Sequence, residues 1–278
     1  MRPLTEHKIL VTGATSGLGQ QVAVELAALG AAVVVHGRDP DRVRETAAKV
    51  AAQSADPARI TTAVADLAAL AEVARLAEIV AIDHPDLTVL VNNAGIGFGR
   101  PGGSREVSRD GIELRFAVNY LAAHLLARRL LPTLTANAPS RIVNVSSAGQ
   151  APFSADPLME RAYDGVLAYR QSKLAMIADT FALAKQTAGT GVTVNTLHPA
   201  SLMPTAMVVE SGWDTMDSLE SGVRATMRLI TDPDLDNMTG RYFFRLEEAD
   251  PLPEASDPAA QTGLAEVTDR LLAEHLGT

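Results

Sequence analysis

The stretch "KILVTGATSGLGQ", residues 8–20, decides the fold. Its apolar start predicts a short buried strand over 8–12, and the glycine-rich turn that follows leads directly into a helical pattern. Gly13, Gly17 and Gly19 are spaced as G-x-x-x-G-x-G. Glycines let the turn close and let the backbone approach a pyrophosphate, whose charge is favoured by the free N–H groups of the helix start. The order strand, turn and helix predicts a dinucleotide site, although the turn alone could be purely structural.

The same pattern continues along the chain. Branched apolar runs that read as strands buried on both faces occupy residues 31–37, 59–66, 87–95, 140–147 and 191–199. Alanine-rich segments of three or four helical turns lie between them and end at Gly, Pro or Asp. This alternation predicts an α/β fold with a doubly wound parallel sheet and right-handed crossovers.

The second half of the chain adds several elements to this sheet. We expect helices over 111–132, 165–187 and 217–231, an irregular stretch over 148–164, a short strand in "GRYFF" and a last helix over about 258–276. Periodicity fades over about 200–216, which we interpret as a lid over the substrate. Leu264, Val267, Leu271 and Leu272 share one face of the last helix, so this helix is expected to pack on the domain, with a subunit contact as the alternative.

Composition limits the class of protein. The 278 residues suit one large domain, 1–278, and 47% of them are hydrophobic, as in a globular core of small aliphatic side chains. The net charge of −9 argues against nucleic acid as a partner and favours a small molecule or a protein. The chain has no cysteine, no signal-peptide pattern and no long apolar run, so we expect a cytoplasmic protein without a disulfide, a thiolate metal site or a membrane span.

The end of the second strand bears on the choice of cofactor. An acidic side chain there would bind a ribose 2′-hydroxyl and select NAD, but this chain has Gly37 followed by Arg38. Arg38, helped by Arg42, could bind a 2′-phosphate, which favours NADP(H); a solvated surface arginine is the alternative. Asp66 and Leu67 follow the third strand and could border the adenine, but an aspartate that caps the next helix explains the acid equally well.

Tyr169 and Lys173 lie four residues apart in "AYRQSKLAMI", so a helix places them on one face. A nearby ammonium lowers the pKa of a phenol, which would make Tyr169 a usable proton shuttle. Many such pairs are exposed and have no role. Ser147, at the end of a strand, could bind a carbonyl oxygen, and Asn119 is a polar residue in an apolar helix that must find partners.

Taken together, "TGATSGLG", "NNAG" at 92–95, Asn119, Ser147 and "YRQSK" resemble the short-chain dehydrogenase/reductase family over residues 8 to about 200. The resemblance implies a single Rossmann-type domain and hydride transfer between a nicotinamide and a carbonyl or alcohol. It implies that Tyr169 is the acid/base, that Lys173 lowers its pKa and holds the nicotinamide ribose, and that Ser147 orients the substrate oxygen. Asn119 would hold a water that links Lys173 to solvent.

The motif and the resemblance together give a set of residues that we expect to contact the cofactor. These residues are Gly13, Ser16, Gly17, Leu18, Gly19, Arg38, Asp66, Leu67, Asn93, Ala94, Gly95, Tyr169, Lys173 and Pro199. No metal site is expected.

The chain departs from the family pattern in two places. The interval from Ser147 to Tyr169 is 22 residues (169 − 147), longer than in many members, and this feature is similar to retinol-dehydrogenase-like proteins and related bacterial reductases. After the sixth strand, the family's Pro-Gly is replaced by Pro199-Ala200, and a displaced Thr205 follows. Tyr163 and Ser146 are rivals of Tyr169 and Ser147, but Tyr163 has no lysine four residues later.

The substrate is expected to be an apolar ketone, aldehyde or secondary alcohol. Residues that could wall its pocket, or else cover the core, are Phe153, Met159, Met203, Met207 and Trp213. Other hypotheses are an inactive NADP(H)-binding sensor or scaffold and an epimerase or dehydratase of nucleotide sugars. The helices at 111–132 and 165–187 could form a homodimer, unless the last helix blocks it.

Overall fold

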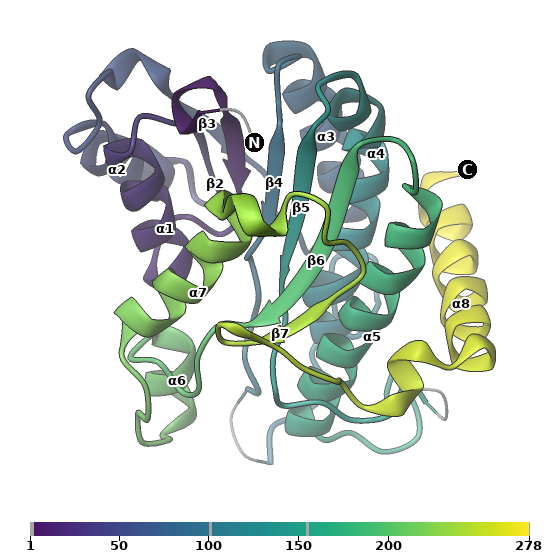
Figure 1. The fold of residues 1–278 in the computed structure, drawn as a ribbon. Coiled ribbons are helices and arrows are strands. Elements are labelled where there is room, and N and C mark those ends of the chain that lie inside the picture. The colour runs from purple at the N-terminus through teal and green to yellow at the C-terminus, as the bar shows by residue number, and fades with distance from the viewer. Residues whose placement is uncertain (1–2, 100–101, 154–155, 278) are drawn as a thin grey trace.

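The computed structural model describes residues 3–99, 102–153 and 156–277, and the side chains of residues 210 and 211 also lie outside the description. One sheet with the strand order β3-β2-β1-β4-β5-β6-β7-β8 runs through the molecule (Figure 1). Its strands are β1 (Lys8–Val11), β2 (Ala32–Gly37), β3 (Ile60–Val64), β4 (Val89–Asn92), β5 (Ser140–Val145), β6 (Val192–His198), β7 (Tyr242–Phe244) and β8 (Glu247–Glu248). All neighbours pair in parallel except β7 and β8. The predicted doubly wound parallel sheet is confirmed.

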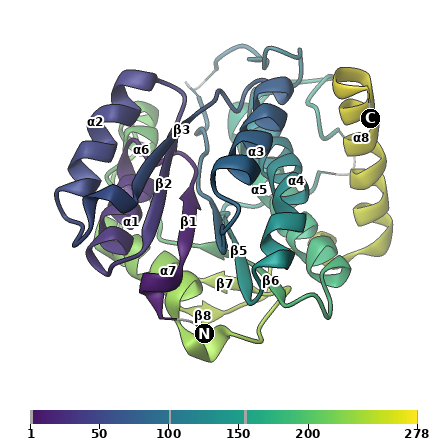
Figure 2. The same ribbon diagram turned by 90° about the horizontal axis from the view of Figure 1, so that it is seen from above.

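Helices cover both faces of the sheet. They are α1 (Gly17–Ala28), α2 (Pro40–Ala51), α3 (Leu70–Asp83), α4 (Ala122–Ala136), α5 (Gly165–Gln186), α6 (Ala206–Ser211), α7 (Leu219–Thr231) and α8 (Pro258–Leu276). Figure 2 shows α1, α2 and α7 on one face and α3, α4 and α5 on the other, with α8 outside them. Each face has its own hydrophobic core, and every residue of β2, β4 and β5 is buried between the two. That double burial explains the uninterrupted apolar runs in the sequence.

Aspartates set the starts of two helices next to the cavity described below. Asp39 caps α2 by accepting hydrogen bonds from the N–H groups of Asp41 and Arg42, and Pro40 takes the first helical position. Asp164 caps α5 in the same way, with bonds from Val166 and Leu167 at 2.8 and 3.2 Å. The second cap fixes where α5 begins, and with it the position of Tyr169 on the second turn.

Two elements differ from the expectation. The helix predicted to end near Pro132 continues to Ala136, because Leu130 and Leu134 on either side of the proline are fully buried and their packing outweighs the one backbone hydrogen bond that proline removes. The short antiparallel strand β8 is not among the strands that the sequence predicted. The irregular stretch at 148–164 has neither helix nor strand among its described residues, which leave out 154 and 155.

The C-terminal helix packs on the domain, as its apolar face predicted. Leu264 and Leu271 are buried, while Val267 and Leu272 are partly buried against the same core. The helix α8 contacts α3 and α5, and the turn at Pro253–Ser256 before it also lies on α5. As a result, residues 171–180 of α5 are buried on every side within one chain. The expected homodimer through α5 remains a prediction. The middle of α5 is already covered by other residues of the same chain.

A buried hydrogen bond fastens α8 to the π-helical segment Phe116–Leu121, which precedes α4. The hydroxyl of Thr268 lies 2.7 Å from that of Tyr120, and it also bonds the carbonyl of Leu264 at 2.8 Å. The Thr268→Val substitution leaves the Tyr120 hydroxyl buried without this partner, so we expect the free energy of unfolding to fall by about 1–3 kcal/mol in urea titration. Thr262→Val is the matched control, because Thr262 makes the same turn-to-turn bond on the exposed face. Equal effects of the two variants would show that the bond between helices contributes nothing.

Candidate active site

A cavity of about 760 Å³ opens at the carboxyl ends of the parallel strands, where the strand order reverses between β1 and β4. Open α/β sheets bind ligands at this point. All the residues expected to contact a cofactor line the cavity, and so does Ser147. Asn119 does not line it but lies directly behind.

The glycine turn is packed too tightly for side chains. A Cβ atom on Gly13, whose φ is 64°, would lie 2.7 Å from the Cα atom of Ala94. A Cβ atom on Gly19 would lie 2.3 Å from the side-chain nitrogen of Asn93, which donates to the carbonyl of Thr12 at 2.8 Å. Ser16 precedes α1 without a capping hydrogen bond from its side chain. The first N–H groups of α1 are therefore open to an anion in the cavity.

The end of β2 forms the far wall of the cavity. A Cβ atom on Gly37 would lie 2.5 Å from the methyl group of Thr15, so the acidic side chain that favours NAD has no room at this position. Arg38 is exposed at the cavity wall, and Arg42 beside it donates to the carbonyl of Thr15 at 3.3 Å. Two guanidinium groups thus border the place where a 2′-phosphate would lie in this fold.

His36 and Asp66 support this end of the cavity. Burial lowers the pKa of His36 to about 4, so its ring is neutral and Nδ1 accepts a hydrogen bond from the N–H of Gly13 at 3.3 Å. Asp66 accepts from the N–H of Ala68 at 3.0 Å and pairs with Arg109 at 3.1 Å. Asp66 therefore holds the turn before α3 and also lines the cavity. It thus occupies both positions that the sequence suggested as alternatives, next to the helix start and at the cofactor cavity.

Ser147, Tyr169 and Lys173 meet at the other end of the cavity. Ser147 follows β5, and its hydroxyl accepts a hydrogen bond from the N–H of Gly149 at 2.9 Å. The Lys173 ammonium is buried and donates to the carbonyl of Val145 at 2.9 Å. It lies 5.7 Å from the centre of the Tyr169 ring. The two residues share the face of α5 that the helical spacing predicted.

The two rival residues lie in other networks. The hydroxyl of Ser146 donates to the carbonyl of Lys173 at 2.8 Å and so joins β5 to α5. Tyr163 accepts a hydrogen bond from Arg115 at 2.7 Å and does not line the cavity. The geometry therefore favours Ser147 and Tyr169 as the pair that can meet one substrate oxygen.

The direction of the pKa shift of Tyr169 differs from the expectation. Burial raises the pKa of the Tyr169 phenol above its ordinary value of 10.0, and the hydrogen bond with Ser147 opposes this only in part. Burial also lowers the pKa of Lys173 to about 8. The expected lowering of the tyrosine pKa by the lysine is absent in the protein without a cofactor, because desolvation dominates for both groups. The phenol is fully protonated at neutral pH.

Asn119 lies in a π-helical segment, Phe116–Leu121, that precedes α4. Single π turns of this kind often occur at functional sites. The side-chain oxygen of Asn119 accepts from the N–H of Ile96 at 2.8 Å, and its nitrogen donates to Ile96 and Ser172 at 3.2 and 3.0 Å. A Cβ atom on Gly95 would approach both Asn119 and Lys173, so these residues are close neighbours. The expected role of Asn119 in a water relay stays a prediction.

Only part of the expected substrate wall is present. Met203, Met207 and Trp213 line the cavity, together with Leu202 and Thr205. The methyl group of Thr205 would lie 3.1 Å from a Cβ atom on Gly17, so the 200–216 segment closes against the glycine turn.

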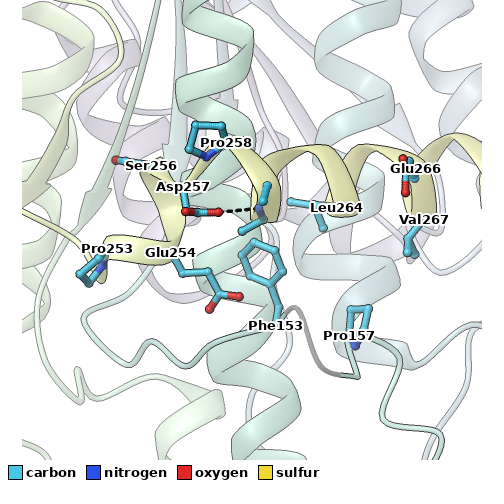
Figure 3. A pocket seen from close by; sticks show the side chains of 13 residues that line it. Phe153, Pro157, Pro253, Glu254, Ser256, Asp257, Pro258, Leu264, Glu266 and Val267 are labelled. Atoms are coloured by element: carbon cyan, nitrogen blue, oxygen red, sulfur yellow. Dashed lines mark hydrogen bonds between the residues drawn. The ribbon is translucent and has the colours of Figure 1, made fainter.

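Phe153 and Met159 do not line the cavity, so for these two residues the alternative holds, in which they cover the core. Both are buried, and Phe153 lies against the C-terminal segment. Phe153 instead borders a second hollow beneath α8, next to Leu264 (Figure 3). In that hollow, Asp257 caps α8 through the N–H of Ala260 at 2.8 Å.

The sequence did not single out Thr15, His36 or Phe98 as lining residues. Phe98 was within reach, because "GIGFG" at 95–99 places it between glycines that mark close packing. His198 also lines the cavity. Its ring is 3.0 Å from the hydroxyl of Ser201, and burial lowers its pKa to about 4, which agrees with a packed histidine that is not a base at neutral pH.

Two features are absent from residues 3–99, 102–153 and 156–277. No group of three or more His, Asp or Glu side chains in the described ranges gathers to hold a metal ion. Within the same ranges, none of the helices has the length and apolar character needed to cross a membrane.

The buried ammonium makes stability depend on pH. The pKa of Lys173 is about 8 in the folded protein and 10.5 in the unfolded chain. Between these values the unfolded chain holds a proton that the folded protein has released, so burial of Lys173 destabilises the fold below pH 8 and this penalty fades as the pH rises. The free energy of unfolding of the wild type, minus that of Lys173→Met, should be flat below pH 7.5. It should then rise toward a slope of about 1.4 kcal/mol per pH unit by pH 9.5. A difference that stays flat to pH 9.5 would contradict the lowered pKa.

Known proteins are similar to this chain in sequence and in fold. A family model for short chain dehydrogenases matches residues 7–215. Retinol dehydrogenase 13 of Mus musculus is 35% identical over 267 residues, which cover 90% of this chain and 78% of that protein. Retinol dehydrogenase 14 of Mus musculus is 34% identical over 286 residues, covering 94% and 84%.

Solved structures agree with the sequence comparison. An uncharacterised protein of Mycobacterium paratuberculosis superimposes with a TM-score of 0.75 at 26% identity, over 95% of this chain and 92% of that one. RhlG of Pseudomonas aeruginosa, solved as an active-site complex with NADP, gives a TM-score of 0.70 at 27% identity, over 88% and 97%. With residues 7–215 matched and the sheet, glycine turn and Ser-Tyr-Lys geometry in place, the chain belongs to the short-chain dehydrogenase family of oxidoreductases, in the subset similar to retinol dehydrogenases.

Proposed function

We propose that the protein is an NADP(H)-dependent oxidoreductase that interconverts an apolar ketone or aldehyde and the corresponding alcohol, with Tyr169 as its acid/base. One observation carries this proposal. A single cavity has Ser147, Tyr169 and Lys173 at one end and the glycine turn with Arg38 and Arg42 at the other. A dinucleotide is the kind of molecule that spans such a distance in this fold, with its pyrophosphate at the start of α1.

The residues present fit NADP(H) better than NAD(H). The start of α1 offers N–H groups to the pyrophosphate because Ser16 does not cap them with its side chain. Gly37 leaves no space for the acid that would bind a free 2′-hydroxyl, and the two arginines supply charge for a 2′-phosphate. The structural relative RhlG, which was solved with NADP, supports the same choice.

The protein's own side chains would donate and accept the proton. When bound, the nicotinamide supplies or accepts the hydride. Ser147 and Tyr169 hydrogen-bond the substrate oxygen, and in reduction the phenol proton passes to this oxygen as the carbonyl carbon gains the hydride, which yields an alcohol. The raised pKa keeps the Tyr169 phenol protonated, which favours reduction. The Lys173 ammonium then stabilises the phenolate until it regains a proton.

The first test is oxidation of NADPH and NADH by the purified protein against a panel of apolar ketones, aldehydes and quinones. Tyr169→Phe removes the proton donor, so we expect kcat/KM to fall by about 10²–10⁴-fold with any substrate that the wild type turns over. Tyr163→Phe is the matched control and should keep most of the activity, because Tyr163 lies outside the cavity.

Two outcomes count against the proposal. Full activity in Tyr169→Phe would remove Tyr169 from the chemistry. Tight binding of NADPH with no turnover on the whole panel would favour the inactive sensor or scaffold, in which the same residues only hold the nucleotide.

Cofactor choice has a separate test. Arg38→Asp should weaken binding of NADPH by about tenfold to a hundredfold in calorimetry, because a charge-assisted hydrogen bond is lost and a repulsive charge is added. Binding of NADH should change little. The control is Arg44→Asp, which makes the same change of charge inside α2, at a residue that does not line the cavity. Equal losses for both nucleotides, or equal losses in both variants, would exclude Arg38 as the selecting residue.

A further inference from the structure

Two aromatic rings, those of Phe98 and Trp213, connect the phenol of Tyr169 to the 200–216 segment. The Phe98 ring meets the Tyr169 ring edge to face, with 4.4 Å between their centres. The indole of Trp213 stacks on the Phe98 ring at 4.5 Å, with 23° between the planes. Trp213 is still 42% exposed, so it forms the outer end of this stack. Both rings line the cavity that also contains Tyr169.

The backbone around Phe98 holds its ring in place. A Cβ atom on Gly97 would lie 2.5 Å from the side chain of Met207, and one on Gly165 would lie 2.2 Å from the carbonyl oxygen of Phe98. Arg115 is buried and donates to the carbonyl of Gly97 at 3.0 Å. Phe98 thus cannot retreat without displacing α5 or α6, whereas Trp213 has no such support.

The ends of the 200–216 segment are fastened to each other. The N–H groups of Asp217 and Met216 donate to the carbonyls of Ser201 and Leu202 at 3.0 and 3.1 Å. The carboxylate of Asp217 accepts from the N–H of Ser201 at 2.7 Å and from Arg245 at 2.6 Å. Leu202 has a φ of 44°, which is strained for a leucine. Met203 packs against Gly222 and Val208 is buried, so the part of the segment that can move is the exposed end at residues 212–216.

Gly212 provides the turn that returns Trp213 to Phe98. It ends the short helix α6 with a φ of 72°, in the left-handed region that glycine adopts easily. Rotation at this residue separates the two rings while the base stays closed. A single aromatic stack is a weak contact and can open in thermal motion.

We propose that Phe98 and Trp213 form an aromatic gate that selects substrates by bulk, with Phe98 as its fixed side and Trp213 as its moving side. This inference rests on the proposed reductase function, because it concerns access to Tyr169. A small carbonyl compound reaches the phenol past the closed pair, and a bulky one requires the Trp213 ring to swing away.

Trp213 is the only tryptophan of the chain, so its fluorescence reports on the gate whether or not the protein is active. Loss of the stacked ring in Phe98→Ala should raise acrylamide quenching of Trp213 by about twofold. Val209→Ala, on the same segment but 68% exposed, should leave quenching unchanged. Phe98→Leu, which keeps the volume, guards against a folding defect and should also raise quenching. Unchanged quenching in both Phe98 variants would overturn the gate.

Substrate selection gives the second readout. Trp213→Ala should raise the ratio of kcat/KM for 2-naphthaldehyde to that for propanal by about tenfold, and Val209→Ala should not change it. An unchanged ratio in an active enzyme overturns the gate and leaves the reductase proposal intact. Increased quenching in the Phe98 variants, with no turnover on any substrate, supports the ring pair and counts against the reductase.

Discussion

Two reciprocal hydrogen bonds between β5 and α5 fix the geometry of the site. The hydroxyl of Ser146 donates to the carbonyl of Lys173, and the ammonium of Lys173 donates to the carbonyl of Val145. Together they hold α5 across the end of β5. Tyr169 lies one turn before Lys173, and Ser147 directly follows Ser146, so Tyr169 and Ser147 meet in the cavity.

The same arrangement buries two titratable groups, Tyr169 and Lys173. Desolvation favours the neutral form of each, which raises the pKa of Tyr169 and lowers that of Lys173. The burial of Lys173 costs stability at neutral pH, an example of a functional site that is held in place by the packing around it. Here α8 and the turn before it supply that packing, because they cover the side of α5 that faces away from the sheet.

Most of the fold and much of the site could be predicted from the sequence. Strands buried on both faces need continuous apolar runs, and the turn at Gly13 admits no side chain, so both leave clear marks in the sequence. The choice between pocket wall and core cover for Phe153 and Met159 could not be made from the sequence, because it does not show that Phe153 packs next to Leu264 of α8. The expected lowering of the Tyr169 pKa by Lys173 differs from the raised pKa in the structure, since helical spacing gives proximity but not burial. The Phe98–Trp213 contact joins segments far apart in the chain, and local patterns cannot predict it.

Burial, and not the neighbouring lysine, sets the proton state of Tyr169 before a cofactor binds. Nuclear magnetic resonance of tyrosine labelled with ¹³C at the ζ carbon tests this directly, because the chain has only four tyrosines and Tyr169→Phe assigns the signal. In the protein without nucleotide, the Tyr169 signal should remain that of a neutral phenol up to pH 10.0, the ordinary pKa of tyrosine, and titrate only above it. A midpoint below that value would show that the Lys173 charge prevails over desolvation, and would contradict the account.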